Sequence, residues 1–133
     1  MKTRWLDRRI ARPGPYLALC LSAEEFRPAI AHLKVTEVPA WINRGADATV
    51  HFFENPDGKT VAVVCLSDSR KRREPVEVAG MLVHEAVHVW QAYCREIGER
   101  NPGDEQEAYA VQSIAQELMA EFARRMRQRE VRP

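Results

Sequence analysis

The stretch of sequence that decides the fold is residues 76–98, which read VEVAGMLVHEAVHVWQAYCREIG. Apolar residues recur in it every three or four positions, which is the period of an α-helix with one buried face. Pro75 suits the first turn of such a helix, and Gly98 is a natural C-terminal stop. The sequence therefore predicts a long helix that ends at Ile97.

This helix carries the motif HEAVH at residues 84–88. Residues four apart project from one face of a helix, so His84 and His88 can grip one tetrahedral ion at about 2 Å each. Glu85 is rotated by about 100° from His84 and can stand beside the ion without ligating it. A carboxylate there can accept a proton from a zinc-bound water and pass it to a leaving amine. The motif predicts a zinc site with two histidine ligands and Glu85 as the catalytic base.

Zinc needs a third protein ligand and one position open to water. The other two histidines, His32 and His51, lie upstream in a predicted helix and a predicted strand. The best source of the third ligand is the start of the next predicted helix. Three acidic residues cluster there after a tight turn: Asp104, Glu105 and Glu107.

HExxH followed one helix later by Glu-x-x-Ala and a polar residue resembles the gluzincin metallopeptidases. The stretches HEAVHVWQ at 84–91 and EQEAYA at 105–110 are also similar to short metallopeptidases of bacteriophages and prophages. The resemblance covers about residues 76–120. It implies a zincin-like fold, a Zn²⁺ cofactor and Glu105 as the third ligand.

The gluzincin position four after this ligand is usually Asp or Asn, which orients a zinc-bound histidine. Here the residue is Tyr109, whose phenol could take over that role or donate a hydrogen bond to the transition state. We therefore expect Tyr109 to belong to the catalytic site. Glu107 is the alternative third ligand, although a solvated charge is the simpler interpretation of it.

The rest of the chain predicts a helix, a β-hairpin and a final helix. Ser22 begins a capping-box pattern before apolar residues at helical spacing, namely Phe26, Ile30 and Leu33. Two β-rich runs at residues 49–54 and 60–66 flank a turn and predict the hairpin. Its second strand is apolar on both faces, so we expect it to be covered on both sides. The final helix should run from about Asp104 to Arg129.

These elements predict one domain over residues 1–133, with an irregular lead-in at 1–15 and a frayed tail at 130–133. Residues 16–21 are apolar and are expected to belong to the folded part. The predicted fold class is α+β, and the resemblance to gluzincins implies a zincin-like arrangement. A small hairpin or sheet packs on the long HExxH helix, which a second long helix follows.

The composition indicates which kinds of partner and which cellular compartment to expect. Lys and Arg number 20 against 19 Asp and Glu, a near-neutral balance that does not favour nucleic-acid binding. No apolar run approaches the length needed to cross a bilayer. The three cysteines, Cys20, Cys65 and Cys94, are far apart and form no CxxC pair, which fits reduced thiols in a cytoplasmic protein.

The predicted function is that of a zinc-dependent hydrolase, a metallopeptidase that cleaves a peptide or protein substrate. The main alternative is a non-catalytic, zinc-stabilised binding or accessory module, motivated by the small size and the unusual Tyr109. A further alternative is a partner- or nucleic-acid-binding accessory in which the HExxH pattern is accidental.

Overall fold

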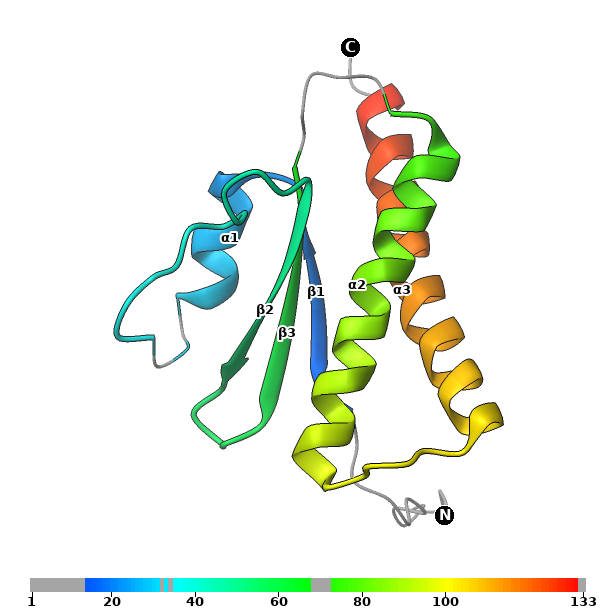
Figure 1. Cartoon of the computed structure of the whole chain (residues 1–133). Helices are drawn as coiled ribbons and strands as arrows, with labels where there is room; N and C mark the ends of the chain where they lie inside the picture. Colours follow the sequence, from blue (N-terminus) through cyan, green and yellow to red (C-terminus); the bar gives the residue numbers. More distant parts are fainter. Residues whose placement is uncertain (1–13, 32, 34, 68–72, 132–133) are drawn as a thin grey trace, which may run out of the picture.

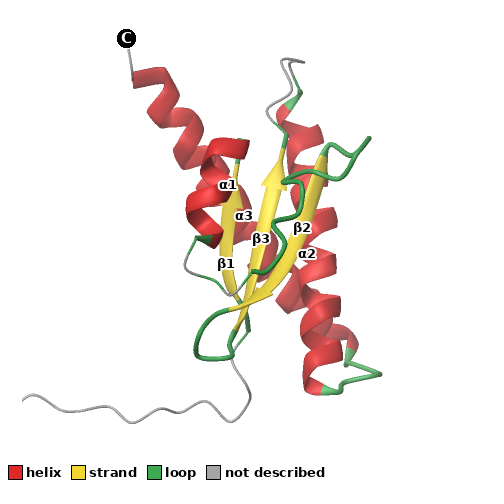
Figure 2. Cartoon of the chain, turned by 90° about the vertical axis from the view of Figure 1, so that its left-hand side faces the viewer, coloured by secondary structure: helices red, strands yellow, loops and turns green. Residues whose placement is uncertain are grey.

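The structure is a computed structural model that describes residues 14–31, 33, 35–67 and 73–131. It belongs to the α+β class. In chain order, its strands and helices are β1 (Tyr16–Cys20), α1 (Ala23–Ile30), β2 (Ala48–Glu54), β3 (Thr60–Leu66), α2 (Pro75–Ile97) and α3 (Asp104–Val131). Figures 1 and 2 show α1 on one side of the sheet, with α2 and α3 together on the other.

The three strands form a mixed sheet in the order β1-β3-β2. β2 and β3 are the predicted hairpin and pair antiparallel, while β1 runs parallel to β3. The central strand β3 is inaccessible on both faces, and Ala62, Val63, Val64 and Cys65 are each 0% exposed. The prediction that this strand is covered on both sides is confirmed.

The strand β1 is an addition that the sequence did not reveal. Its residues, Tyr16–Cys20, were expected to be part of the folded structure without a defined element. Five residues are too few to show a clear period, and the strand's partner lies far along the chain. A parallel strand also needs a crossover connection, which here passes through α1 and β2 before the chain enters β3.

Side chains on the two faces of the sheet form two apolar clusters. On the face toward α2 and α3, the buried residues include Leu19, Val64, Leu82, Ala86, Val89 and Leu118. On the face toward α1 they are Cys20, Phe26, Ile30, Leu33, Val63 and Cys65. Burying apolar side chains on both faces of one sheet fixes α2 against the strands, and that contact positions the HExxH motif.

Most predicted helix boundaries are confirmed. Helix α2 ends at Ile97 and is capped by Gly98, whose φ of 75° lies in the left-handed region that favours glycine. Ser22 caps α1 as predicted and accepts a hydrogen bond from the backbone N–H of Glu25 at 3.2 Å. That helix ends at Ile30, although the buried Leu33 continues the apolar surface.

Helix α3 continues to Val131, two residues past its predicted end at about Arg129. Residues 132–133 lie outside the described residues. Of the predicted lead-in, residues 1–13 also lie outside them, and β1 begins only at Tyr16.

Candidate functional site

The three functional positions of the HExxH motif divide between the buried and exposed sides of α2. The buried side of the helix includes Leu82, Ala86 and Val89, which pack against the sheet. Glu85 lies on this side and is 5% exposed, whereas His84 and His88 are exposed. Each residue turns the helix by about 100°, so His84 and His88, four residues apart, lie on the same side of α2. Glu85, one residue after His84, points to a different side.

The imidazoles of His84 and His88 converge. Their Nε2 atoms are 3.2 Å apart, and their ring centroids are 4.9 Å apart with an interplanar angle of 72°. Two nitrogens that bind one tetrahedral Zn²⁺ at the usual bond lengths lie about 3.3 Å apart. The pair therefore fits two adjacent positions of a tetrahedral metal ion without rearrangement.

Gln91 adds a contact behind this pair. The Nδ1 atom of His88 is 3.1 Å from Oε1 of Gln91. The sequence pointed to Tyr109 on the other helix for this role, and Gln91 was not predicted. The available clue was its place three residues after His88, since residues three apart are neighbours on a helix surface.

Glu85 is unusual for a carboxylate. Among the described residues only Thr49 and Glu85 are polar and buried, and the Glu85 carboxyl has no hydrogen-bond partner there. Burial raises the pKa of Glu85, and the nearby His84 and His88 oppose that rise. A buried carboxyl without a partner is costly, and such groups concentrate at functional sites.

The predicted third ligand is not part of this group. Glu105 is exposed in the first turn of α3. Glu107 accepts a hydrogen bond from the indole Nε1–H of Trp90 at 2.9 Å. Within the described residues, His, Cys, Asp and Glu nowhere form a group of three suited to hold a metal ion. The structure therefore brings together two of the three predicted ligands, His84 and His88.

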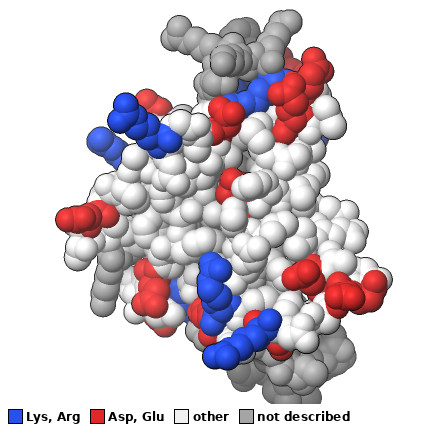
Figure 3. All heavy atoms as spheres, in the orientation of Figure 1, with Lys and Arg blue, Asp and Glu red and all other residues white. Residues whose placement is uncertain are grey.

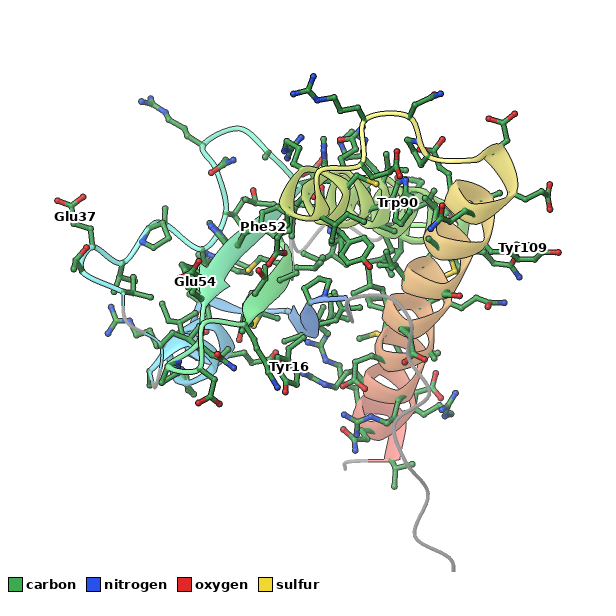
Figure 4. The ribbon with its side chains drawn as sticks, turned by 90° about the horizontal axis from the view of Figure 1, so that it is seen from below. Tyr16, Glu37, Phe52, Glu54, Trp90 and Tyr109 are labelled. Carbon is green, nitrogen blue, oxygen red and sulfur yellow. The ribbon has the colours of Figure 1, made fainter. Side chains whose placement is uncertain are left out.

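Tyr109 is also separated from the imidazole pair. Its side chain is 65% exposed and points outward from α3, away from α2 (Figure 4). The phenol therefore contacts neither His84 nor His88 in this arrangement, and Gln91 occupies the position behind His88 where Tyr109 was considered.

The histidine of β2 has a structural role. Nε2 of His51 is 2.9 Å from the carbonyl oxygen of Trp41, to which it can donate a hydrogen bond. Its ring stacks on the ring of Phe53, and its ring centroid is 5.0 Å from that of Phe26, on the face of the sheet that α1 covers. His51 is therefore separated from α2 by the sheet, and His32 lies outside the described residues.

Surface charge is mixed. Figure 3 shows basic and acidic side chains spread around the visible face, with uncharged surface between them. Arg73, the last residue of the basic run 70–73, donates hydrogen bonds to Ser67 and Asp47. It therefore ties the start of α2 to the end of the sheet, while residues 70–72 lie outside the description.

Neither α2 nor α3, nor the shorter α1, is long and apolar enough to span a membrane, as far as the described residues go.

The candidate site is defined by geometry on α2: a converging imidazole pair, an amide in contact with one ring and a buried carboxyl beside them. Comparison with family models, curated proteins and solved structures found no match to this chain.

Proposed function

We propose that this protein is a zinc-dependent hydrolase, a metallopeptidase of the zincin-like type. The observation that carries the proposal is the buried carboxyl of Glu85, which has no hydrogen-bond partner among the described residues, beside two imidazoles whose Nε2 atoms are 3.2 Å apart. A packing helix has no structural need for either feature. Both are what hydrolysis by a metal and a general base requires.

The side chains divide the work as follows. His84 and His88 hold the ion, which when bound polarises the substrate carbonyl and makes water a better nucleophile. Glu85 accepts the proton from the attacking water and delivers it to the leaving amine. Burial raises the pKa of this carboxyl, which brings it closer to the value that suits a general base at neutral pH.

The proposal needs a third protein ligand, and Glu105 remains the candidate for it. Glu105 lies in the first turn of α3, directly after the connection from α2. It is exposed, so its carboxylate is available to a cation. The first turn of α3 would have to approach the imidazole pair when the site is loaded. Glu107 is the weaker candidate because the Trp90 indole already binds its carboxylate.

Metal content and peptide cleavage test the proposal together. Protein purified without chelators should contain one zinc per chain, and His84→Ala with His88→Ala should contain none. Wild-type protein should cleave members of a fluorogenic peptide library, and Glu85→Gln should retain zinc but lose cleavage. Full cleavage by Glu85→Gln would exclude the assigned base, and zinc-free wild-type protein that cannot be loaded would exclude the metal site.

A second candidate, a zinc-stabilised binding module without catalysis, is favoured by the placement of Glu105 and Tyr109. Neither lies at the imidazole pair, so the described arrangement has fewer functional groups than a peptidase needs. The two candidates differ in one respect. A binding module would contain zinc and lose thermal stability when it is removed, but would cleave no peptide in the library.

A further inference from the structure

We infer that Gln91 is a positioning residue for the imidazole pair and holds His88 in the tautomer that carries its proton on Nδ1. The contact that carries this inference joins Nδ1 of His88 to Oε1 of Gln91 at 3.1 Å. Its consequence for metal binding rests on the proposed function, but the tautomer itself does not.

The chemistry of the two groups fixes the direction of this hydrogen bond. An amide oxygen only accepts, so the imidazole nitrogen that faces it donates and carries the proton. A neutral imidazole has one proton, so Nε2 of His88 then keeps its lone pair. That lone pair faces Nε2 of His84 at 3.2 Å, so the Nε2 atom of His88 would be available to hold a metal ion together with His84.

Without this contact, the other tautomer would be the resting form. An imidazole in water carries its proton mainly on Nε2, and a proton there would occupy the position that a metal needs. Gln91 therefore removes a rearrangement that would otherwise precede binding, in the way that outer partners orient metal-bound histidines in general.

The same helix supplies all three participants. His84, His88 and Gln91 lie on α2, which is fixed against the sheet by Leu82, Ala86 and Val89. The arrangement of the pair thus does not depend on where the first turn of α3 lies. This distinguishes Gln91 from Tyr109, whose side chain would have to come from α3 and points away.

The tautomer can be measured directly in metal-free protein. Long-range ¹H–¹⁵N correlation spectra, recorded at a pH where the imidazoles are neutral, distinguish a protonated from an unprotonated ring nitrogen. Wild-type His88 should show the proton on Nδ1. Gln91→Leu removes the acceptor and should move the proton toward Nε2, whereas Gln91→Glu keeps an acceptor oxygen and should restore the wild-type pattern.

Zinc affinity supplies the second readout, measured by competition with a chromophoric chelator. Gln91→Leu should bind zinc about tenfold more weakly than wild type, and Gln91→Glu should bind at least as well as wild type. Gln116→Leu, the same change at an exposed position of α3, is the control and should alter neither readout.

The outcomes separate this inference from the proposed function. Wild-type His88 with its proton on Nε2, or a Gln91→Leu spectrum identical to wild type, would overturn the role of Gln91. A wild-type protein with the Nδ1 proton but no affinity for zinc would overturn the metal site and leave the positioning contact in place. Equal zinc affinities in wild type and Gln91→Leu would show that the contact does not prepare the site.

Discussion

The indole Nε1–H of Trp90 donates a hydrogen bond to Oε2 of Glu107 at 2.9 Å, and this bond joins the last third of α2 to the first turn of α3. Trp90 is 4% exposed, so its N–H has little access to water. The bond occupies the carboxylate that was the alternative third ligand, and it sets where the start of α3 lies relative to the imidazole pair.

Loss of this bond should lower stability. Glu107→Ala leaves the buried indole N–H of Trp90 without its partner, which should reduce the free energy of unfolding by about 1–2 kcal/mol. Urea denaturation, monitored by tryptophan fluorescence, measures this free energy of unfolding. Glu107→Gln keeps an acceptor oxygen and should lose less than half as much. Equal stabilities for Glu107→Ala and wild type would show that water replaces the bond.

The two glutamates at the start of α3 should differ in their effect on metal binding. Glu105→Ala should weaken zinc binding by more than about 100-fold, because a direct ligand contributes more than the residues that orient ligands. Glu107→Ala should bind zinc within a few-fold of wild type. Competition with a chromophoric chelator measures both. The reverse order would reassign the third ligand to Glu107.

The buried carboxyl of Glu85 should make the stability of the metal-free protein depend on pH. Burial raises the pKa of Glu85 in the folded state, so the folded protein binds its proton more readily than the unfolded chain. The native state is therefore penalised above the folded pKa. That penalty is relieved as the pH falls through the folded pKa toward the unfolded value of about 4.3.

Glu85→Gln removes the buried charge, since an amide costs less to bury than a carboxylate. Its thermal midpoint should exceed that of wild type at pH 7 in the presence of a chelator, and the difference should shrink toward pH 4. Glu117→Gln, at an exposed position of α3, is the matched control and should show a much smaller difference. A Glu85→Gln protein that is less stable than wild type at pH 7 would contradict the prediction.

Arg125 joins α3 to the opposite end of the chain. Its guanidinium contacts both carboxylate oxygens of Glu25 in α1, Glu121 at 2.9 Å and the carbonyl oxygen of Leu19 in β1 at 3.3 Å. Arg125→Leu should therefore destabilise the protein by about 1–3 kcal/mol in urea denaturation. Arg124→Leu, which loses only the exposed pair with Glu121, should cost clearly less than Arg125→Leu, because solvent screens that pair. Equal losses would show that the contacts to β1 and α1 contribute little.

The three cysteines should resist alkylation in the native state. Cys20, Cys65 and Cys94 are free and buried. The hydrogen bond between the Cys20 and Cys65 thiols raises the pKa of Cys65 and lowers that of Cys20. Burial therefore protects both, because the reagent cannot reach either sulfur atom in the folded protein. Iodoacetamide at pH 8 should modify none of them without denaturant and all three in urea, as measured by intact mass. Rapid labelling of Cys20 or Cys65 in the native protein would indicate that β1 and β3 separate.

Some parts of the fold depended on local sequence and others on packing between distant segments. The hairpin, the course of α2 and its end at Gly98 were predicted because a period of two or 3.6 residues and a glycine stop are local features. Strand β1 was not predicted, since its pairing with β3 joins residues far apart in the chain.

In the candidate site, too, some features follow from local sequence and others from packing. The sequence by itself determined that His84 and His88 share one side of α2, because their spacing and the helix period fix that relationship whatever the helix packs against. Only the tertiary structure decided that Glu85 faces the buried side, that the Glu107 carboxylate binds Trp90, and that Tyr109 points outward. Those three facts depend on how α2 and α3 rotate about their axes to bury apolar surface against the sheet. The apolar stripe of each helix indicates its buried face, but residues distant in sequence set the exact rotation and the contacts that each polar side chain makes.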